Sequence, residues 1–229
     1  MDETGTLSVV ATPIGNLEDM THRAVRILSE VDYVLCEDTR MTGKLLKHYG
    51  INTVVKRYDA HASDAAHERI LSDLGNGKHL ALVSDAGTPG VSDPGVRLVR
   101  EARAAGARLE AIPGPSALTA AISIAGFSGN QFTFLGFVPQ KKGRQTFFAG
   151  LPAYDHPVIF FESTHRIMKT LSALKENLSV NQKVSVAREL TKLHEEFVSG
   201  TLETVLQYFE DNPEHQRGEF VLLVEKQNN

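Results

Sequence analysis

The segment that most constrains the fold is Ser84–Gly95, SDAGTPGVSDPG, which directly follows the apolar run His79–Val83. A short strand therefore enters a turn with three glycines and two prolines, after which a helix begins. Glycine lets the backbone approach a ligand closely, and proline holds a turn rigid. In an open α/β sheet, ligands bind outside the carboxyl ends of strands, where this turn lies. Because a plain strand-to-helix connection needs only a few residues, we interpret the segment as a ligand-binding turn.

The first half of the chain alternates strand-like and helix-like segments, with apolar residues at the matching spacing. Helix-stop glycines follow the second, third and fourth helices, and Ser63 caps the third. This alternation predicts a parallel sheet covered on both faces. The expected strands are 7–11, 32–36, 53–56, 79–83 and 108–112, and the expected helices are 19–30, 42–49, 63–74 and 93–105.

The pattern breaks at Pro113–Ser116, and a helix of small residues is expected over 117–125. The strands that follow are closer together and include hairpins, which predicts a mixed sheet. The fold class is therefore α/β, with a parallel-sheet domain over 1–115 and a mixed α/β domain over 116–229. Further strands are expected at 131–137, 158–161, 183–187, 195–199 and 219–225, and helices at 165–178 and 202–209.

The composition limits the partners of the chain. Its net charge of −4 gives no global attraction to nucleic acid or to an anionic membrane, so an RNA partner requires a local basic patch, a second subunit or a missing segment. The single cysteine, Cys36, excludes an internal disulfide framework, fits a reducing cytosol and is expected to be buried and inert. No apolar run approaches the ~20 residues that span a bilayer, and the acidic start is unlike a signal peptide.

Common cofactor and metal motifs are absent from the sequence. No GxGxxG follows the first strand, and no phosphate-binding GxxxxGK[ST] occurs. No Cys/His set has zinc spacing, so no metal site is expected. We interpret His61 and His67 as solvated residues of an amphipathic helix.

Two polar segments end strands of the first half. Thr12–Leu17 follows the first strand, and Glu37–Arg40 follows the second. They can be read as a plain turn and as a helix N-cap with a surface ion pair. Since both lie at the same sheet edge as the glycine-rich turn, they are also candidate ligand walls. Likewise, Pro113–Ala117 is a hinge that can close on a ligand.

The second half carries two further polar clusters, Glu162–Arg166 and Ala187–Lys192, each following an apolar strand. We expect both to face one edge of the second sheet and to form a convergent polar site. The dense basic stretch Lys141–Arg144 is expected in a loop, where it is either a solvated surface or a phosphate contact.

Together these segments resemble the tetrapyrrole-methylase-like group of S-adenosylmethionine methyltransferases, and within it the ribosomal small-subunit RNA 2′-O-methyltransferase I family. The resemblance covers about Leu7 to Glu225. It rests on TPIGNLEDMTHRA (12–24), EDTR (37–40), LVSDAGTPGVSDPG (82–95), IPGPSA (112–117), FFESTHR (160–166), ARELTK (187–192) and RGEFVLLVE (217–225).

The resemblance implies two αβα domains with S-adenosylmethionine in the cleft between them, and a cytoplasmic homodimer. It implies methyl transfer to a cytidine 2′-hydroxyl in the decoding region of small-subunit ribosomal RNA. Because a chain with a net charge of −4 binds naked RNA weakly, we expect the substrate to be the RNA in an assembled particle. The cofactor would lie against Pro13, Gly87, Thr88, Val91, Ser116, Ala117 and Ala187. The residues expected to bind the RNA are Arg40, Lys141, Lys142, Arg144, Arg166, Arg188 and Lys192. Of these, Arg40, Arg166, Arg188 and Lys192 would either hold phosphates or orient the neighbouring carboxylates.

A ribose hydroxyl is a poor nucleophile, so an acceptor for its proton should help; the candidates are Asp38, His165 and Glu189. Two other functions remain open: methylation of a small tetrapyrrole, and a binding module without turnover. The sequence also departs from the family pattern. Tyr58–Ser63 stands where members often have a His-Asn-Glu-like run, and Asn229 ends the sequence where members often continue into a helical extension.

Overall fold

The computed structural model describes residues 4–92, 95–126, 130–179 and 181–226. It divides into two compact units, Met1–Ser116 and Ala117–Asn229. Each unit is built around its own sheet, and the two are described in turn.

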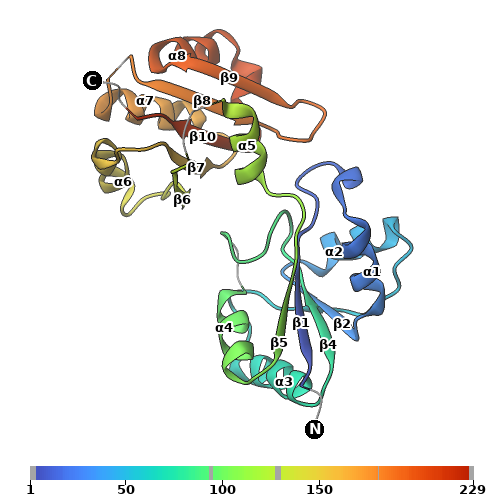
Figure 1. The fold of residues 1–229 in the computed structure, drawn as a ribbon. Coiled ribbons are helices and arrows are strands. Elements are labelled where there is room, and N and C mark those ends of the chain that lie inside the picture. The colour runs from blue at the N-terminus through green and yellow to red at the C-terminus, as the bar shows by residue number, and fades with distance from the viewer. Residues whose placement is uncertain (1–3, 93–94, 127–129, 180, 227–229) are drawn as a thin grey trace. The chain divides into compact units, whose positions relative to one another are not determined.

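The first unit contains a five-stranded sheet with the strand order β3-β2-β4-β1-β5 (Figure 1). All neighbouring strands pair in parallel, which confirms the predicted parallel sheet. The central strands are buried on both faces and read as continuous apolar runs, as parallel strands do. The strands are β1 (Thr6–Val10), β2 (Tyr33–Cys36), β3 (Val55–Arg57), β4 (His79–Leu82) and β5 (Arg108–Ile112).

Helices cover both faces of this sheet (Figure 1). Apolar residues of α1 and α2 pack with Val10 and Val34 on one face, and those of α3 and α4 pack with Leu7 and Leu35 on the other. Thr21, Asp38 and Ser63 cap the first three helices through their side-chain oxygens. The helices are η1 (Leu17–Asp19), α1 (His22–Glu30), α2 (Thr39–His48), α3 (Asp64–Gly75) and α4 (Val96–Ala104).

The second unit contains a mixed sheet with the order β6-β7-β10-β8-β9. Strand β6 pairs in parallel with β7, and the other neighbours are antiparallel, which confirms the predicted mixed sheet. The strands are β6 (Thr133–Phe137), β7 (Val158–Glu162), β8 (Lys183–Arg188), β9 (Glu196–Thr201) and β10 (Phe220–Val224).

One face of the second sheet is buried under α6, α7 and α8, around Phe148, Leu171 and Phe209. Helix α5 packs against β10. The helices are α5 (Ala117–Ala125), α6 (Arg144–Gly150), η2 (Leu151–Ala153), α7 (Ile167–Asn177), α8 (Leu202–Asp211) and η3 (Pro213–Gln216).

Several expectations are corrected. The basic stretch 141–144 is not all loop, because Arg144 begins α6. His67 is not solvated: it is buried, with Nδ1 2.8 Å from the Tyr58 hydroxyl and Nε2 2.7 Å from a Glu101 carboxylate oxygen. The start expected for the helix at 93 lies outside the described residues. Cys36 is buried as predicted, and burial raises the pKa of its thiol.

Candidate active site

Two loops at the carboxyl edge of the first sheet are locked to each other. The backbone N–H of Thr12 donates to the carbonyl of Gly87, and the N–H of Gly87 donates to the carbonyl of Thr12, both at 2.9 Å. The buried Thr12 hydroxyl also donates to the Ser84 carbonyl at 3.2 Å. Because β1 and β4 are neighbours whose following helices cover opposite faces, this is the topological switch point where open α/β sheets bind ligands.

A third loop, Pro113–Ser116 after β5, contacts the other two. The Thr88 hydroxyl donates to the Pro115 carbonyl at 3.2 Å. At Gly114 an added Cβ would lie 3.1 Å from the Ala11 Cβ, and at Gly87 it would lie 3.3 Å from Ile14 Cγ2. The three loops therefore approach so closely that a side chain at either glycine would press on its neighbour, and the positive φ of Gly87 also favours glycine there.

The structure brings four predicted cofactor residues to this edge: Pro13, Gly87, Thr88 and Ser116, of which only Gly87 is fully buried. Val91 lies further along the turn and is 40% exposed, and Ala117 begins α5. Ala187 lies elsewhere. It is completely buried in β8, between Phe197 and Val221 of the neighbouring strands.

Asp38 links the second strand to the same edge, because its backbone N–H donates to the Asp85 carboxylate at 3.3 Å. Its own carboxylate caps α2 by accepting the Arg40 N–H at 2.8 Å, and it pairs with the Arg40 guanidinium at 2.6 Å. Those contacts with Arg40 hold the pKa of Asp38 well below its usual range. A carboxylate held ionised in this way is a weak proton acceptor at neutral pH. The Arg40 side chain is 86% exposed.

The two polar clusters of the second unit share one sheet edge, as predicted. Strands β7 and β8 both run antiparallel to β10, so their carboxyl ends point the same way. Among the described non-glycine residues, only His165, Glu189 and Thr191 have positive φ, at 67°, 50° and 66°. All three lie in the loops after these strands. Strained backbone of this kind is concentrated at functional sites.

Glu162, at the end of β7, organises the first of these loops. Its fully buried carboxylate lies 2.6 Å from Nη2 of Arg166 and 3.3 Å from Nη1 of Arg144, and accepts the Thr170 hydroxyl. Arg144 also donates to the Pro139 carbonyl within the turn, so it joins the basic turn to Glu162 at the end of β7. The two arginines predicted to hold RNA are thus engaged with a buried carboxylate.

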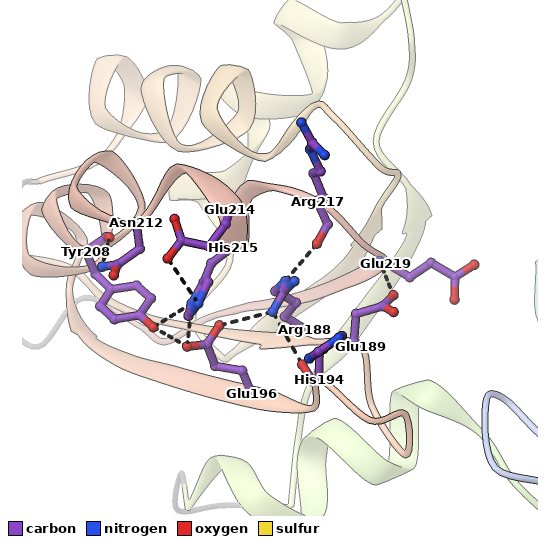
Figure 2. A network of polar contacts seen from close by, with 10 residues as sticks. All are labelled: Arg188, Glu189, His194, Glu196, Tyr208, Asn212, Glu214, His215, Arg217 and Glu219. Carbon is purple, nitrogen blue, oxygen red and sulfur yellow. Dashed lines mark hydrogen bonds and ion pairs between the residues drawn. The ribbon is translucent and has the colours of Figure 1, made fainter.

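Arg188 is the centre of a second polar network (Figure 2). Its guanidinium donates to the Arg217 carbonyl at 2.7 Å and the His194 carbonyl at 3.4 Å, and pairs with Glu196 at 3.6 Å. Glu196 in turn accepts hydrogen bonds from Tyr208 and His215. Since Arg188 is only 8% exposed, its side chain holds the β8–β9 connection in place rather than presenting a charge to a ligand.

Glu189 and Lys192 are likewise tied together. One Glu189 oxygen accepts Nζ of Lys192 and the N–H of Glu219, each at 2.9 Å, and the Lys192 ammonium also reaches the Glu219 carboxylate at 2.8 Å. Burial acts to raise the pKa of Glu189, but these hydrogen bonds outweigh it and hold the pKa below its ordinary value. Glu189 is therefore an ionised side chain that stabilises the loop after β8 through these hydrogen bonds.

Three predicted residues of the second unit present their side chains more openly. Lys141 and Lys142 are exposed, and they line a cavity of about 740 Å³ with residues of α6 and α7. His165 is exposed, and its imidazole has no hydrogen-bond or ion-pair partner within the described ranges. Ser84 and Glu162 organise these loops but are not among the predicted site residues; a polar residue that ends an apolar strand is the sequence signal for both.

Comparison with known proteins identifies relatives along nearly the whole chain. The profile of the tetrapyrrole (corrin/porphyrin) methylases matches residues 6–206. A protein from Xylella fastidiosa named ribosomal RNA small subunit methyltransferase I is 46% identical, over 98% of this chain and 83% of the relative. Proteins of the same name are 44% identical in Synechocystis, covering 96% and 78%, and 43% identical in Thermotoga maritima, covering 90% and 92%.

Solved structures share the fold at low sequence identity. Diphthine synthase matches with a TM-score of 0.74 at 16% identity, covering 98% of this chain and 91% of that chain. Uroporphyrin-III-C-methyltransferase from Thermus thermophilus matches with a TM-score of 0.63 at 18% identity, covering 97% and 94%.

The hydrogen-bonded loops at the carboxyl edge of the first sheet suit the methyl donor of this family, S-adenosylmethionine. That molecule carries a ribose diol, an amino-acid group and an adenine, which pair with backbone N–H and C=O groups. Residues 85–86, 90–92 and 113–114 of these loops are exposed, and no described residues form a cluster of three metal-ligating side chains. The chain belongs to the ribosomal RNA small subunit methyltransferase I family, a branch of the S-adenosylmethionine-dependent tetrapyrrole methylases.

Proposed function

We propose that the chain transfers a methyl group from S-adenosylmethionine to a cytidine 2′-hydroxyl in the decoding region of small-subunit ribosomal RNA. The observation that carries the proposal is the 46% identity, over 98% of the chain, to a protein named as a methyltransferase of that RNA. The locked loops at the first sheet edge support it, because they supply a rigid surface for the methyl donor.

In this proposal the turn from Gly87 to Val91 and the loop at Ser116 and Ala117 bind the cofactor through main-chain groups. Pro13 supplies an apolar wall beside them. Ala187 of the second unit has a completely buried side chain, so any contact that it makes with the cofactor would be through its main chain. The mutual hydrogen bonds of the loops leave little reorganisation to be made when the cofactor binds.

When bound, S-adenosylmethionine supplies a methyl group on a positively charged sulfur, a good leaving group. The work of the protein is then mainly alignment, for which positioning alone contributes several kcal/mol. Of the three candidate proton acceptors, we favour His165. Asp38 and Glu189 are each held ionised by a basic partner, whereas the exposed imidazole has no such partner in the described part of the chain.

The proposed substrate is RNA within an assembled small subunit, and the proposed enzyme is a cytoplasmic homodimer. A chain with a net charge of −4 has little general attraction for naked RNA, so the shape of the particle and local lysines must contribute. Lys141 and Lys142 are exposed cations available for phosphate contact. In the described part of the chain, no helix has the length and apolarity to cross a membrane.

The test is methyl transfer from isotope-labelled S-adenosylmethionine to three acceptors: assembled small subunits, a short oligonucleotide with the same cytidine, and a porphyrinoid. We expect transfer to the subunits, less to the oligonucleotide and none to the porphyrinoid. Transfer to the porphyrinoid alone would favour tetrapyrrole methylation. Cofactor binding without transfer to any acceptor would favour a binding module.

The role of His165 needs a separate comparison. His165→Gly should lower kcat strongly while leaving KM for RNA nearly unchanged, and added imidazole should restore part of kcat. His61→Gly, at an exposed histidine of the first unit, is the control. Loss of kcat without any rescue, accompanied by a lower melting temperature, would mean that His165 only shapes its strained loop.

A further inference from the structure

A β-bulge in the edge strand β6 redirects one phenylalanine. Phe134 pairs with Ile159 and Phe137 pairs with Phe161, and the register shifts between these two pairs. Residues three apart in a regular strand point to opposite faces. Gly136, with φ +68°, allows the shift, so that Phe134 and Phe137 lie on the same face.

The result is a cluster of three aromatic rings. The rings of Phe134 and Phe137 both pack edge-on against Phe161, with centroids 4.8 and 5.2 Å away. This face is opposite to the one buried under α6, α7 and α8, where Phe160 of the neighbouring position lies. Phe137 remains 52% exposed although it packs against Phe161, so a large apolar ring faces water. A redirected, ordered and exposed aromatic ring indicates a binding surface.

The chain segment that contains β6 and the turn after it carries positive charge. Residues 111–154 contain no aspartate or glutamate, in a chain whose net charge is −4. Within this stretch, Lys141 and Lys142 are exposed on the turn that follows β6. Arg144 anchors the turn by donating to the Pro139 carbonyl, and the Val138 N–H donates to the Phe161 carbonyl at 3.0 Å. The lysines therefore follow the ring-bearing strand at the edge of the sheet, where they line the cavity beside α6 and α7, and the rings lie on the other face of that edge.

We propose that Phe134, Phe137 and Phe161 form a stacking platform for an unpaired base of the RNA substrate, and that Lys141 and Lys142 bind the phosphates next to it. The inference rests on the proposed function and adds to it a means of holding a base outside the helical stack. Sequence-specific RNA recognition uses aromatic rings for splayed bases, and cations along the backbone complete such grooves. A second copy of the chain fits less well, because protein interfaces are depleted of lysine.

The experiment measures the affinity of the full chain for a fluorescently labelled decoding-region RNA fragment. Phe137→Ala should weaken binding by about tenfold, the loss expected for one stacked base. Phe137→Trp should bind as well as wild type, and Phe137→Leu should remain weak, because leucine keeps the bulk but not the aromatic face. Phe132→Ala is the matched control, since that ring is exposed before β6 and outside the cluster. Affinity for S-adenosylmethionine should not change in any variant.

Replacing single unpaired bases of the RNA by abasic sites identifies the stacked base. At one such position the abasic loss and the Phe137→Ala loss should not add, because both remove the same contact. The proposal would be wrong if the abasic loss and the Phe137→Ala loss added fully at every RNA position, or if Phe137→Leu bound the RNA as well as wild type.

Sedimentation of the same variants tests whether a second copy of the chain, and not RNA, covers the aromatic cluster. A change of oligomeric state in Phe137→Ala, reversed by Phe137→Leu, would assign the surface to a second copy of the chain. Failure of the proposed function is separable from both outcomes. In that case the wild-type chain itself would transfer no methyl group to small subunits, whereas failure of the platform alone would leave wild type and Phe137→Ala equally active and equally bound.

Discussion

Thr12 and Gly87 exchange two backbone hydrogen bonds of 2.9 Å, although 75 positions separate them in the sequence. Each residue comes just after the end of a parallel strand, so the pair joins the loop after β1 to the glycine-rich turn after β4. The carboxyl edge of the first sheet is therefore a fixed surface formed from main chain.

Gly87→Ala should weaken this surface. Its φ of +79° costs an alanine about 1–2 kcal/mol, and the new methyl group would lie 3.3 Å from Ile14 Cγ2. Calorimetry should show a lower affinity for S-adenosylmethionine together with a lower free energy of unfolding. Gly50→Ala is the control, since Gly50 has a φ of +67° and nothing within 4 Å of the added Cβ. Equal cofactor affinity in the two variants would contradict the role of the turn.

Thr88 provides a second test of the same surface. Thr88→Arg should abolish S-adenosylmethionine binding by filling the space beside the turn, while circular dichroism shows an intact fold. Thr88→Val removes only the 3.2 Å hydrogen bond to Pro115 and should cost about 1 kcal/mol of stability. If Thr88→Arg binds the cofactor as well as wild type, Thr88 does not belong to the site.

Glu162→Gln should strongly destabilise the second unit. The substitution leaves the guanidinium groups of Arg144 and Arg166 beside a buried neutral amide, and breaking a buried ion pair costs about 3–5 kcal/mol. Urea unfolding measures the loss. Glu30→Gln is the control, because its ion pair with Arg26 is exposed and should contribute less than about 1 kcal/mol. A similar small effect in both variants would refute the organising role of Glu162.

Much of the fold and the position of the first site follow from local sequence. Turn chemistry in Ser84–Gly95, together with the alternation of strands and helices, is sufficient to predict a parallel sheet with a ligand edge. The mixed character of the second sheet follows from its closely spaced strands. Each of these patterns lies within a short stretch of sequence, so it can be recognised without knowledge of tertiary contacts.

The roles of the charged residues could not be predicted in this way. Arg144 is 18 residues from Glu162, and Arg188 is 29 residues from the Arg217 carbonyl, so their internal partners are set by tertiary packing. A surface arginine and an internally paired one look alike in sequence. The bulge at Gly136 could not be predicted either, because the strand expected at 131–137 carries no local signal for the shift in register.

The basic turn should divide into two lysines that bind RNA and one arginine that holds the fold. Lys141→Ala/Lys142→Ala should flatten the salt dependence of RNA binding, lowering the slope by about 0.7–0.9 for each phosphate that is no longer neutralised, with stability unchanged. Arg144→Ala should instead lower the free energy of unfolding, because it removes the interactions with Glu162 and Pro139. Identical salt slopes for the lysine variant and wild type would make the turn a solvated surface.

Asp73 should contribute pH-dependent stability. The Lys78 ammonium at 2.7 Å and the Tyr33 hydroxyl lower the pKa of this carboxylate, against the opposing effect of burial. A lowered folded-state pKa means that the stabilisation is fully present above the unfolded value, about 3.9, and is lost as the pH falls through the folded pKa. The difference in unfolding free energy between wild type and Asp73→Asn should therefore shrink on acidification. A difference that is the same at neutral and acidic pH would contradict this assignment.

The most direct test of the proposed function is mass mapping of small-subunit ribosomal RNA from cells with and without the gene for this chain. The account predicts that one decoding-region cytidine carries a ribose methyl group in the presence of the gene and lacks it in its absence. Purified wild-type chain with S-adenosylmethionine should restore that methyl group on unmodified subunits. An identical methylation map in both cells, or a methyl group on a base instead of the ribose, would contradict it.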